Sequence, residues 1–79
     1  MIGERLKKLR ENKNMTQGDV AEALGVNTAT ISKYESNSLE PSIESIKKLA
    51  DLYDITIDEL LKDEQFDVSK INVLEVLKE

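Results

Sequence analysis

Residues 17–36 place the tightest constraint on how this chain can fold, and they read QGDVAEALGVNTATISKYES. Two runs with helical spacing are separated by Gly25, a residue that takes the positive φ of a tight turn at little cost. Ala21 supplies a small side chain where two crossing helices approach closely. Ile31 supplies a branched apolar side chain that holds the second helix against the first. The segment therefore predicts two short helices that cross at a steep angle.

Two helices joined in this way form a helix-turn-helix, and in DNA-binding proteins with this motif the second helix enters the major groove. The outward-facing residues of that helix then contact the edges of the bases. The pattern therefore indicates a DNA-binding function, with the exposed residues from Thr28 onward as the candidate base contacts.

Apolar spacing and capping residues predict five helices, and hence an all-α fold. They are expected at residues 2–13, 17–24 and 28–35, with a fourth from residue 43 and a short fifth that ends near residue 62. Asn14 is expected to end the first helix in the left-handed conformation. The expected N-caps are Thr16, Asn27, Ser42 and Thr56, of which the first and last form capping boxes with Asp19 and Glu59. The fourth helix is expected to bury a stripe made of Ile43, Ile46, Leu49, Ala50 and Tyr53.

The composition excludes several classes of protein. The 79 residues include no cysteine and no histidine, which rules out a disulfide framework and the usual zinc ligands. No apolar run approaches the roughly 20 residues of a membrane helix, and the N-terminus has no apolar signal core. No phosphate-cradling glycine-rich loop and no carboxylate pair in a cleft point to catalysis. We expect a small cytoplasmic protein with no metal, no cofactor and no enzymatic activity.

The net charge of −5 argues against DNA binding, because DNA-binding domains are usually basic. The segment that begins at Asp63 contains five acids and two bases and so carries −3 of this charge, which leaves residues 1–62 near −2. Bases are concentrated between Arg5 and Lys13, where a DNA-facing surface and a solvated helix face fit the pattern equally well. One copy would neutralise few phosphates, so we expect weak non-specific binding and two subunits on the DNA.

Residues 63–79 form a separate segment with a wide apolar face. Something is expected to cover this face, either its own domain or the same segment of a second subunit. A strand paired across a dimer and a fragment cut from a longer protein remain alternatives. We therefore divide the chain into a DNA-binding domain, residues 1–62, and a dimerisation or partner-binding helix whose contacts would be Phe66, Ile71, Leu74 and Leu77.

Two long stretches carry a family pattern, IGERLKKLRENKNMTQGDVAEALGVNTATISKYE and EPSIESIKKLADLYDITIDELL. The specific elements are MTQ at the start of the second helix, Ala21 and Gly25 within the motif, Ile31 with Glu35 in the third helix, and PS before the fourth. With these elements, residues 2–62 resemble the XRE family of helix-turn-helix regulators, of the phage repressor and Cro type. The resemblance implies a compact five-helix domain that binds double-stranded operator DNA as a two-fold homodimer.

The resemblance also implies roles for individual residues. Gln17 would bond a DNA phosphate at the start of the second helix, where an anion is also attracted. Base contacts would come from Thr28, Ala29, Ser32 and Lys33, and contacts to the DNA backbone from Asn27, Thr30 and Asn37. Arg10 and Glu35 would form a structural salt bridge between the first and third helices, which keeps Arg10 from being a DNA contact.

The chain departs from the family pattern after the third helix, where it reads ESNS in place of a motif with glycine. Asn37 can take the left-handed conformation at modest cost, so we expect the turn to survive. The following loop, SNSLEPS, has no basic residue, which again predicts modest affinity for DNA. Gly18 inside the second helix costs about 1 kcal/mol relative to alanine, and it would permit a close backbone approach, for example to DNA.

The leading hypothesis is a sequence-specific transcriptional regulator, a repressor that binds an inverted-repeat operator as a homodimer. The alternative is a protein-interaction module, antitoxin-like or controlled by an anti-repressor, whose C-terminal segment binds a protein partner. The apolar face that follows Phe66 motivates this alternative.

Overall fold

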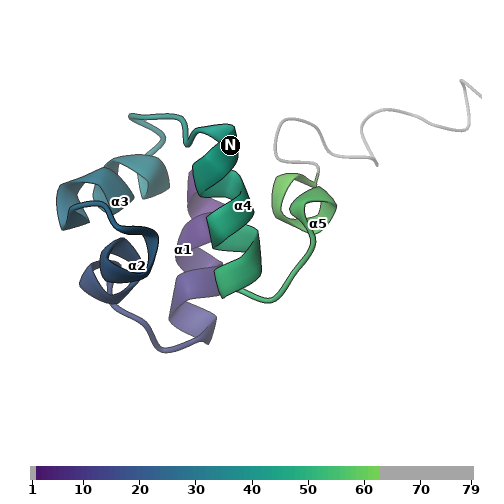
Figure 1. Cartoon of the computed structure of the whole chain (residues 1–79), viewed down its shortest axis with the longest axis horizontal. Coiled ribbons are helices and arrows are strands. Elements are labelled where there is room, and N and C mark those ends of the chain that lie inside the picture. Colours follow the sequence, from purple (N-terminus) through teal and green to yellow (C-terminus); the bar gives the residue numbers. More distant parts are fainter. Residues whose placement is uncertain (1, 63–79) are drawn as a thin grey trace, which may run out of the picture.

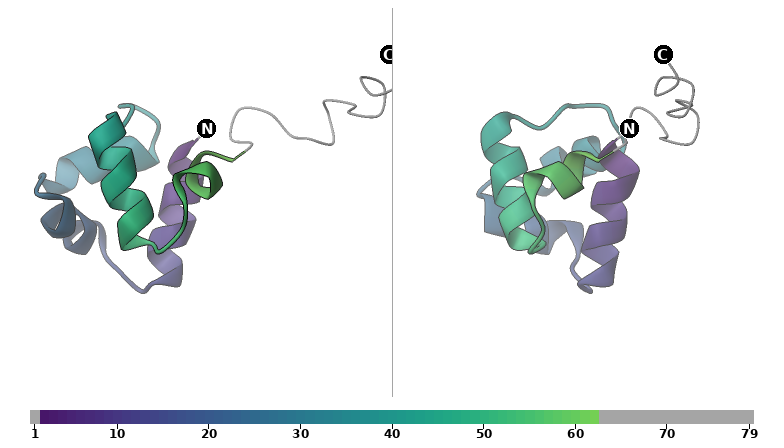
Figure 2. Two further views of the ribbon diagram at one scale, coloured as in Figure 1. Left: turned by 45° about the vertical axis from the view of Figure 1, so that its right-hand side comes forward. Right: turned by 90° about the vertical axis from the view of Figure 1, so that its right-hand side faces the viewer.

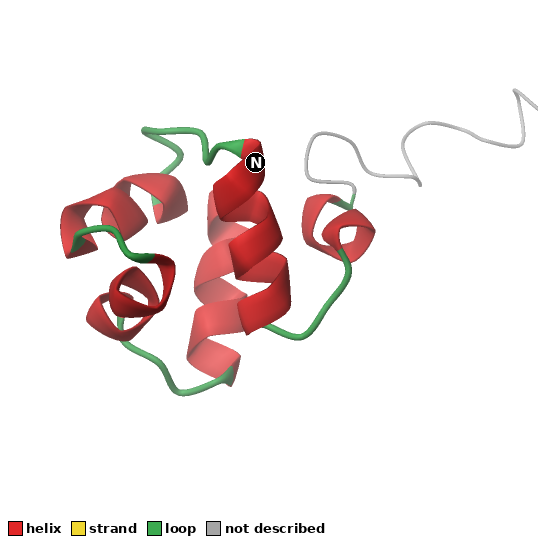
Figure 3. Cartoon of the chain, in the orientation of Figure 1, coloured by secondary structure: helices red, strands yellow, loops and turns green. Residues whose placement is uncertain are grey.

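The computed structural model of the chain describes residues 2–62. These residues form five helices and no strand: α1 (Ile2–Asn12), α2 (Gln17–Leu24), α3 (Thr28–Glu35), α4 (Ile43–Leu52) and α5 (Ile57–Leu61) (Figures 1 and 3). The five-helix prediction is confirmed, and α2 and α3 begin and end at the predicted residues. The expected contacts of Phe66, Ile71, Leu74 and Leu77 lie outside the described residues.

Local capping explains where the helices begin. Thr16 closes a complete capping box with Asp19, in which the Thr16 hydroxyl accepts from the Asp19 amide at 3.0 Å and the Asp19 carboxylate accepts from the Thr16 amide at 2.9 Å. The side chains of Asn27 and Ser42 accept from backbone amides three residues ahead, as predicted. Thr56 does the same for the amide of Glu59. The starts of α2, α3, α4 and α5 are therefore each fixed by residues within one turn.

Residues with positive φ angles follow α1, α2, α3 and α4 and shape the turns there. Gly25 has φ of 76° and ends α2, which confirms the turn of the helix-turn-helix. Asn14 and Asn37 also take the left-handed conformation, with φ of 57° and 65°. Asp54 has φ of 58° and makes the same kind of turn after α4, a turn that was not predicted from the sequence.

The helices pack around one core. α3 packs on both α1 and α2, α4 packs on α2, and α5 packs on α1 and α4, on the side of the molecule away from α2 and α3 (Figures 1 and 2). Every helix contributes at least one buried apolar side chain, and the largest that are fully buried are Leu6, Val20, Ile31, Leu49 and Leu60. Because Leu60 has no exposed surface, even the five-residue α5 is part of the core.

The predicted apolar stripe of α4 is wrong at one position. Ile46, Leu49, Ala50 and Tyr53 are buried, but Ile43 is 74% exposed. Ile43 is the first residue of α4, directly after the exposed N-cap Ser42, and the preceding loop leaves Leu39 exposed as well. The helical period places Ile43 on the same side of α4 as the buried residues. The core does not extend as far as the first turn of α4, however, so Ile43 stays exposed.

Candidate nucleic-acid interface

One side of α3 is buried and the other is open. Ile31 and Tyr34 are buried, and the Tyr34 hydroxyl lies 3.2 Å from the hydroxyl of Ser45 on α4. The four predicted base-contacting residues, Thr28, Ala29, Ser32 and Lys33, are all exposed. They form a row on the outer surface of a helix held against α1 and α2, so their backbone positions are set by the core.

Asn27 and Thr30 are joined at the start of α3. The Asn27 Oδ1 atom accepts from both the amide and the hydroxyl of Thr30, each at 2.9 Å. The Thr30 hydroxyl therefore already donates its proton to Asn27. A phosphate oxygen only accepts hydrogen bonds, so it would need that same proton. A phosphate contact through the Thr30 hydroxyl would have to replace this bond, while the Asn27 Nδ2 group has the chemistry to donate without such a change.

Gln17, the first residue of α2, is half-buried and bonded to α3. Its Nε2 atom donates to the Glu35 Oε1 atom at 3.0 Å. The family resemblance implies a phosphate contact for Gln17, and nothing in the sequence indicates this bond to Glu35. The two residues lie 18 positions apart, and no local pattern predicts the pairing of their side chains.

Arg10 and Glu35 lie together between α1 and α3. The Arg10 Nε and Nη2 atoms donate to the two Glu35 carboxylate oxygens at 2.7 and 3.1 Å, and the Arg10 Nη1 atom donates to the Met15 carbonyl at 2.9 Å. Their side chains are 12% and 5% exposed. The hydrogen bond to Glu35 raises the pKa of the Arg10 guanidinium. With Gln17 as a third donor, Glu35 connects α1, α2 and α3.

Tyr53, the C-cap of α4, adds a titratable group near this pair. The residue is 4% exposed. Burial raises the pKa of the Tyr53 hydroxyl to about 12, and the negative charge of Glu35 adds to the increase while Arg10 opposes it. The folded protein therefore holds this proton more tightly than an unfolded chain does.

Raising the pH from 10 to 12 is expected to destabilise the native protein more than it destabilises a Tyr53→Phe variant. Because the pKa of Tyr53 is raised above its ordinary value of 10.0, its contribution to stability is complete below that pH and is lost as the pH rises through about 12. Urea unfolding curves across this range would measure the difference. Identical pH profiles for the two proteins would show that the hydroxyl ionises as easily in the folded state as in the unfolded one.

Asn37 has a structural contact that its neighbours in the sequence do not predict. Its Oδ1 atom accepts from the Gly3 amide at 2.9 Å and so caps the start of α1 from 34 positions away. Gly3 is buried against the end of α3, where an added Cβ would lie 2.8 Å from the Asn37 Oδ1 atom. The Asn37 Nδ2 group can still donate to a phosphate, because only the oxygen of the amide is needed for the cap.

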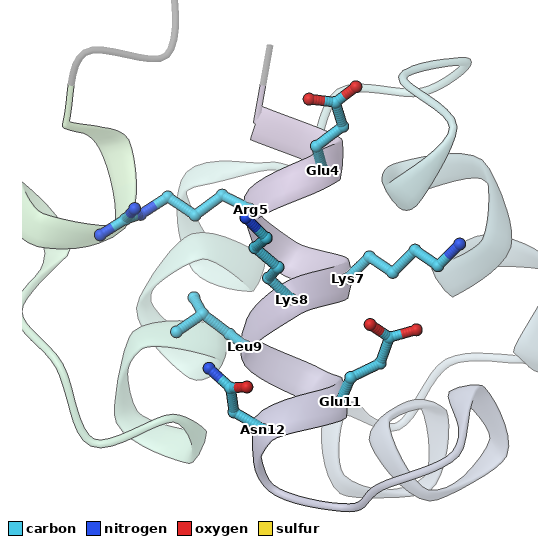
Figure 4. A pocket seen from close by; sticks show the side chains of 7 residues that line it. All are labelled: Glu4, Arg5, Lys7, Lys8, Leu9, Glu11 and Asn12. Atoms are coloured by element: carbon cyan, nitrogen blue, oxygen red, sulfur yellow. The ribbon is translucent and has the colours of Figure 1, made fainter.

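An open hollow runs along the outer surface of α1, lined by Glu4, Arg5, Lys7, Lys8, Leu9, Glu11 and Asn12 (Figure 4). Arg5 reaches across to α5, where its Nε atom donates to the Glu59 carbonyl at 2.9 Å. Lys7 and Glu11 project to the other side of α1. Two acids flank the three bases here, and Arg5 and Arg10 both have structural partners, so the basic cluster resembles a solvated helix face more than a phosphate-binding surface.

Gly18 is exposed beside the start of α3. An added Cβ would meet only the hydroxyl oxygens of Thr16 and Thr28, at 3.7 and 3.8 Å, which are ordinary contact distances. Packing among the described residues therefore does not require a glycine here. The close backbone approach expected at Gly18 would therefore involve a molecule outside the chain, such as DNA.

Comparisons with known proteins agree with this geometry. The helix-turn-helix family HTH_3 matches residues 6–60. The HTH-type transcriptional activator BcrR of Enterococcus faecalis is 45% identical over 64 residues, which cover 81% of this chain and 31% of BcrR. The phage CTXphi transcriptional repressor RstR of Vibrio cholerae is 32% identical over 84 residues, which cover 100% of this chain and 76% of RstR. The chain thus spans less than a third of the activator and about three quarters of the repressor.

Solved structures with the same fold include two protein–DNA complexes and one complex of two proteins. The P22 c2 repressor in complex with a synthetic operator has a TM-score of 0.74 at 29% identity, covering 78% of this chain and 94% of that one. The biofilm regulator SinR in complex with DNA has a TM-score of 0.72 at 33% identity, covering 78% and 100%. A complex of the SinR and SinI proteins has a TM-score of 0.74 at 27% identity, covering 99% and 79%.

Proposed function

The chain belongs to the HTH_3 family of helix-turn-helix transcriptional regulators, and from this premise we propose that it is a repressor that binds an inverted-repeat operator as a homodimer. The observation that carries the proposal is the exposed row on α3, opposite a buried face that fixes the helix on α1 and α2. Such a regulator acts on DNA, so a cytoplasmic, nucleoid location is part of the proposal.

The exposed row of α3 has the chemistry to distinguish bases. Thr28 would bond a base or contact a thymine methyl, and Ala29 would contact a thymine methyl. Lys33 would donate to the O6 or N7 atom of guanine, with Ser32 beside it. All four side chains are exposed on a helix whose start is fixed by Asn27, so their approach to a groove requires no rearrangement of the core.

Contacts to the DNA backbone would flank this row. Gln17 lies at the start of α2, and Asn27, Thr30 and Asn37 lie at the two ends of α3. These contacts carry no sequence information and set the position of the protein on the duplex. Because the loop after α3 contains no basic residue, the proposal includes a modest affinity of one subunit for DNA. Binding of DNA would then depend strongly on two subunits acting together.

The homodimer follows from the proposed operator. Two recognition helices about 34 Å apart would enter successive major grooves of an inverted repeat. In α5, Ile57 and Leu61 lie one turn apart and are 38% and 48% exposed, which leaves an apolar strip at the end of the domain. The segment with Phe66, Ile71, Leu74 and Leu77 follows directly in the sequence, and we propose that it takes part in the same contact.

A second candidate function is binding of a protein partner through residues 63–79, as an antitoxin-like module or one controlled by an anti-repressor. It is favoured by the similarity to SinR in a structure where SinR is in complex with SinI. The size of the purified protein separates the two candidates. A stable dimer supports self-association, whereas a monomer supports a separate protein partner.

Selection of bound sites from a random duplex pool, at low and at moderate salt, tests the main proposal. Enrichment of an inverted repeat whose half-sites are one helical turn apart would support a dimeric, sequence-specific regulator. If no sequence is enriched at either salt concentration, α3 does not read DNA by itself.

Lys33→Ala and Gln17→Ala are expected to weaken binding in different ways. Loss of Lys33 removes a base contact, so affinity for the selected site falls by about 1 kcal/mol and one base position becomes less specific. Loss of Gln17 removes a phosphate contact, so all sites weaken alike. Titration of both variants against the selected site and single-base variants of it would measure this. A specificity change with Gln17→Ala, or none with Lys33→Ala, would contradict the assignment.

A further inference from the structure

We propose that Glu35 is a positioning residue for DNA binding, which orients the amide of Gln17 so that its nitrogen bridges the Glu35 carboxylate and a DNA phosphate. The inference rests on the proposed function, because it assigns how one of its phosphate contacts is made. It gives the partly buried pair of Arg10 and Glu35 a role in DNA binding in addition to its structural one.

The hydrogen bond between Gln17 and Glu35 determines which end of the Gln17 amide faces the protein. A carboxylate only accepts hydrogen bonds, and so does a phosphate, whereas an amide has one donating and one accepting end. The Gln17 Nε2 atom lies 3.0 Å from the Glu35 Oε1 atom, so the donating end is fixed there. Nε2 carries two N–H groups. One bonds Glu35, and the second is the group that bonds a phosphate.

Arg10 makes this arrangement compatible with DNA. A lone carboxylate next to a phosphate would repel it, but Arg10 bonds both oxygens of Glu35 at 2.7 and 3.1 Å and neutralises the charge. The Glu35 side chain is only 5% exposed, so water has little access to compete for its oxygens. Glu35 therefore acts as a fixed and neutralised acceptor for the Gln17 amide.

Positioning of this kind has a measurable consequence. An amide already held in its binding orientation loses less freedom when the phosphate arrives than one that rotates and flips. We expect Gln17 to contribute about fivefold to the affinity for DNA when Glu35 is present. Without Glu35 the contribution should fall below about twofold, because the amide then has no fixed orientation.

A double-mutant cycle tests the coupling. Arg10→Met and Glu35→Met together remove the pair without leaving one buried charge, an exchange that proteins often tolerate. Gln17→Ala is then added to the native chain and to this double variant, and binding to a mixed-sequence duplex is followed by fluorescence anisotropy across a range of salt concentrations. Such a duplex suffices because phosphate contacts are independent of sequence. All four proteins are checked for cooperative unfolding before titration.

The expected result is a smaller effect of Gln17→Ala in the double variant than in the native chain, with parallel salt dependence, because a neutral amide releases no counterion. Lys33→Ala is the control, and whatever factor it costs on this duplex should be the same in both backgrounds, because the described structure shows no hydrogen bond or ion pair between Lys33 and Arg10 or Glu35. An equal effect of Gln17→Ala in both backgrounds would overturn the inference. Failure of the native chain to bind any duplex would instead overturn the proposed function.

A measurement on the native chain covers the case in which the double variant does not fold. The two side-chain amide protons of Gln17 are distinguishable by NMR, with Gln65→Ala removing the only other glutamine signal. On addition of the duplex, one proton should shift and the other should keep its position, because its bond to Glu35 persists. A shift of both protons, or of neither, would contradict the bridge.

Discussion

Replacing Glu35 with alanine is expected to lower the free energy of unfolding by about 3 kcal/mol. The change leaves the Arg10 guanidinium at the interface of α1 and α3 without its carboxylate partner, and that side chain is only 12% exposed. It also removes the acceptor of Gln17, so two donors lose their partner at once. In a chain of only 79 residues, a loss of this size is a large share of the total stability.

Urea unfolding at neutral pH would measure this loss. The matched control is the chain with Arg10→Met and Glu35→Met together, which removes both charges and should lie much closer to the native stability than Glu35→Ala does. If the single and double variants are equally destabilised, lost packing and not an unpaired charge is the cause. A near-native Glu35→Ala variant would show that the pair contributes little.

Replacing Gly3 with alanine is expected to destabilise the domain by about 2 kcal/mol. A Cβ at this position would lie 2.7 Å from the carbonyl carbon of Glu35 and 2.8 Å from the Asn37 Oδ1 atom. The first of these neighbours is backbone, so α1 would have to move away from the end of α3. That movement would also lengthen the bond by which Asn37 caps α1.

Gly18→Ala is the matched control for this prediction, since it makes the same chemical change in another helix. An added Cβ at Gly18 meets nothing closer than 3.7 Å, so the change should raise stability by up to about 1 kcal/mol through helix propensity alone. Thermal unfolding of the two variants would therefore move in opposite directions. Equal shifts would mean that helix propensity, and not the close approach of α1 and α3, determines the effect at Gly3.

Features that depend on neighbouring residues could be predicted from the sequence. The five helices, the capping box of Thr16 and Asp19, and the turn at Gly25 all agree with the structure, because each depends on hydrogen bonds or φ angles within about one helical turn. The exposed row on α3 could be predicted from the sequence for a related reason, since the helical period separates it from Ile31 and Tyr34. The pairing of Arg10 with Glu35, by contrast, was expected only from the family resemblance.

The sequence by itself thus determined the all-α fold of residues 2–62 with its helix-turn-helix, and it named the outer residues of the second helix of that motif. Only the tertiary structure decided the rest: that Gln17 bonds Glu35, that Asn37 caps α1 at Gly3, and that Ile43 stays exposed. The physical reason is the range of the interactions. The caps that start α2 to α5 and the turn at Gly25 are fixed by groups within one turn of each other, whereas these polar pairs join residues 18 and 34 positions apart. Such pairs exist only after the core has brought the helices together, and no sequence period encodes them.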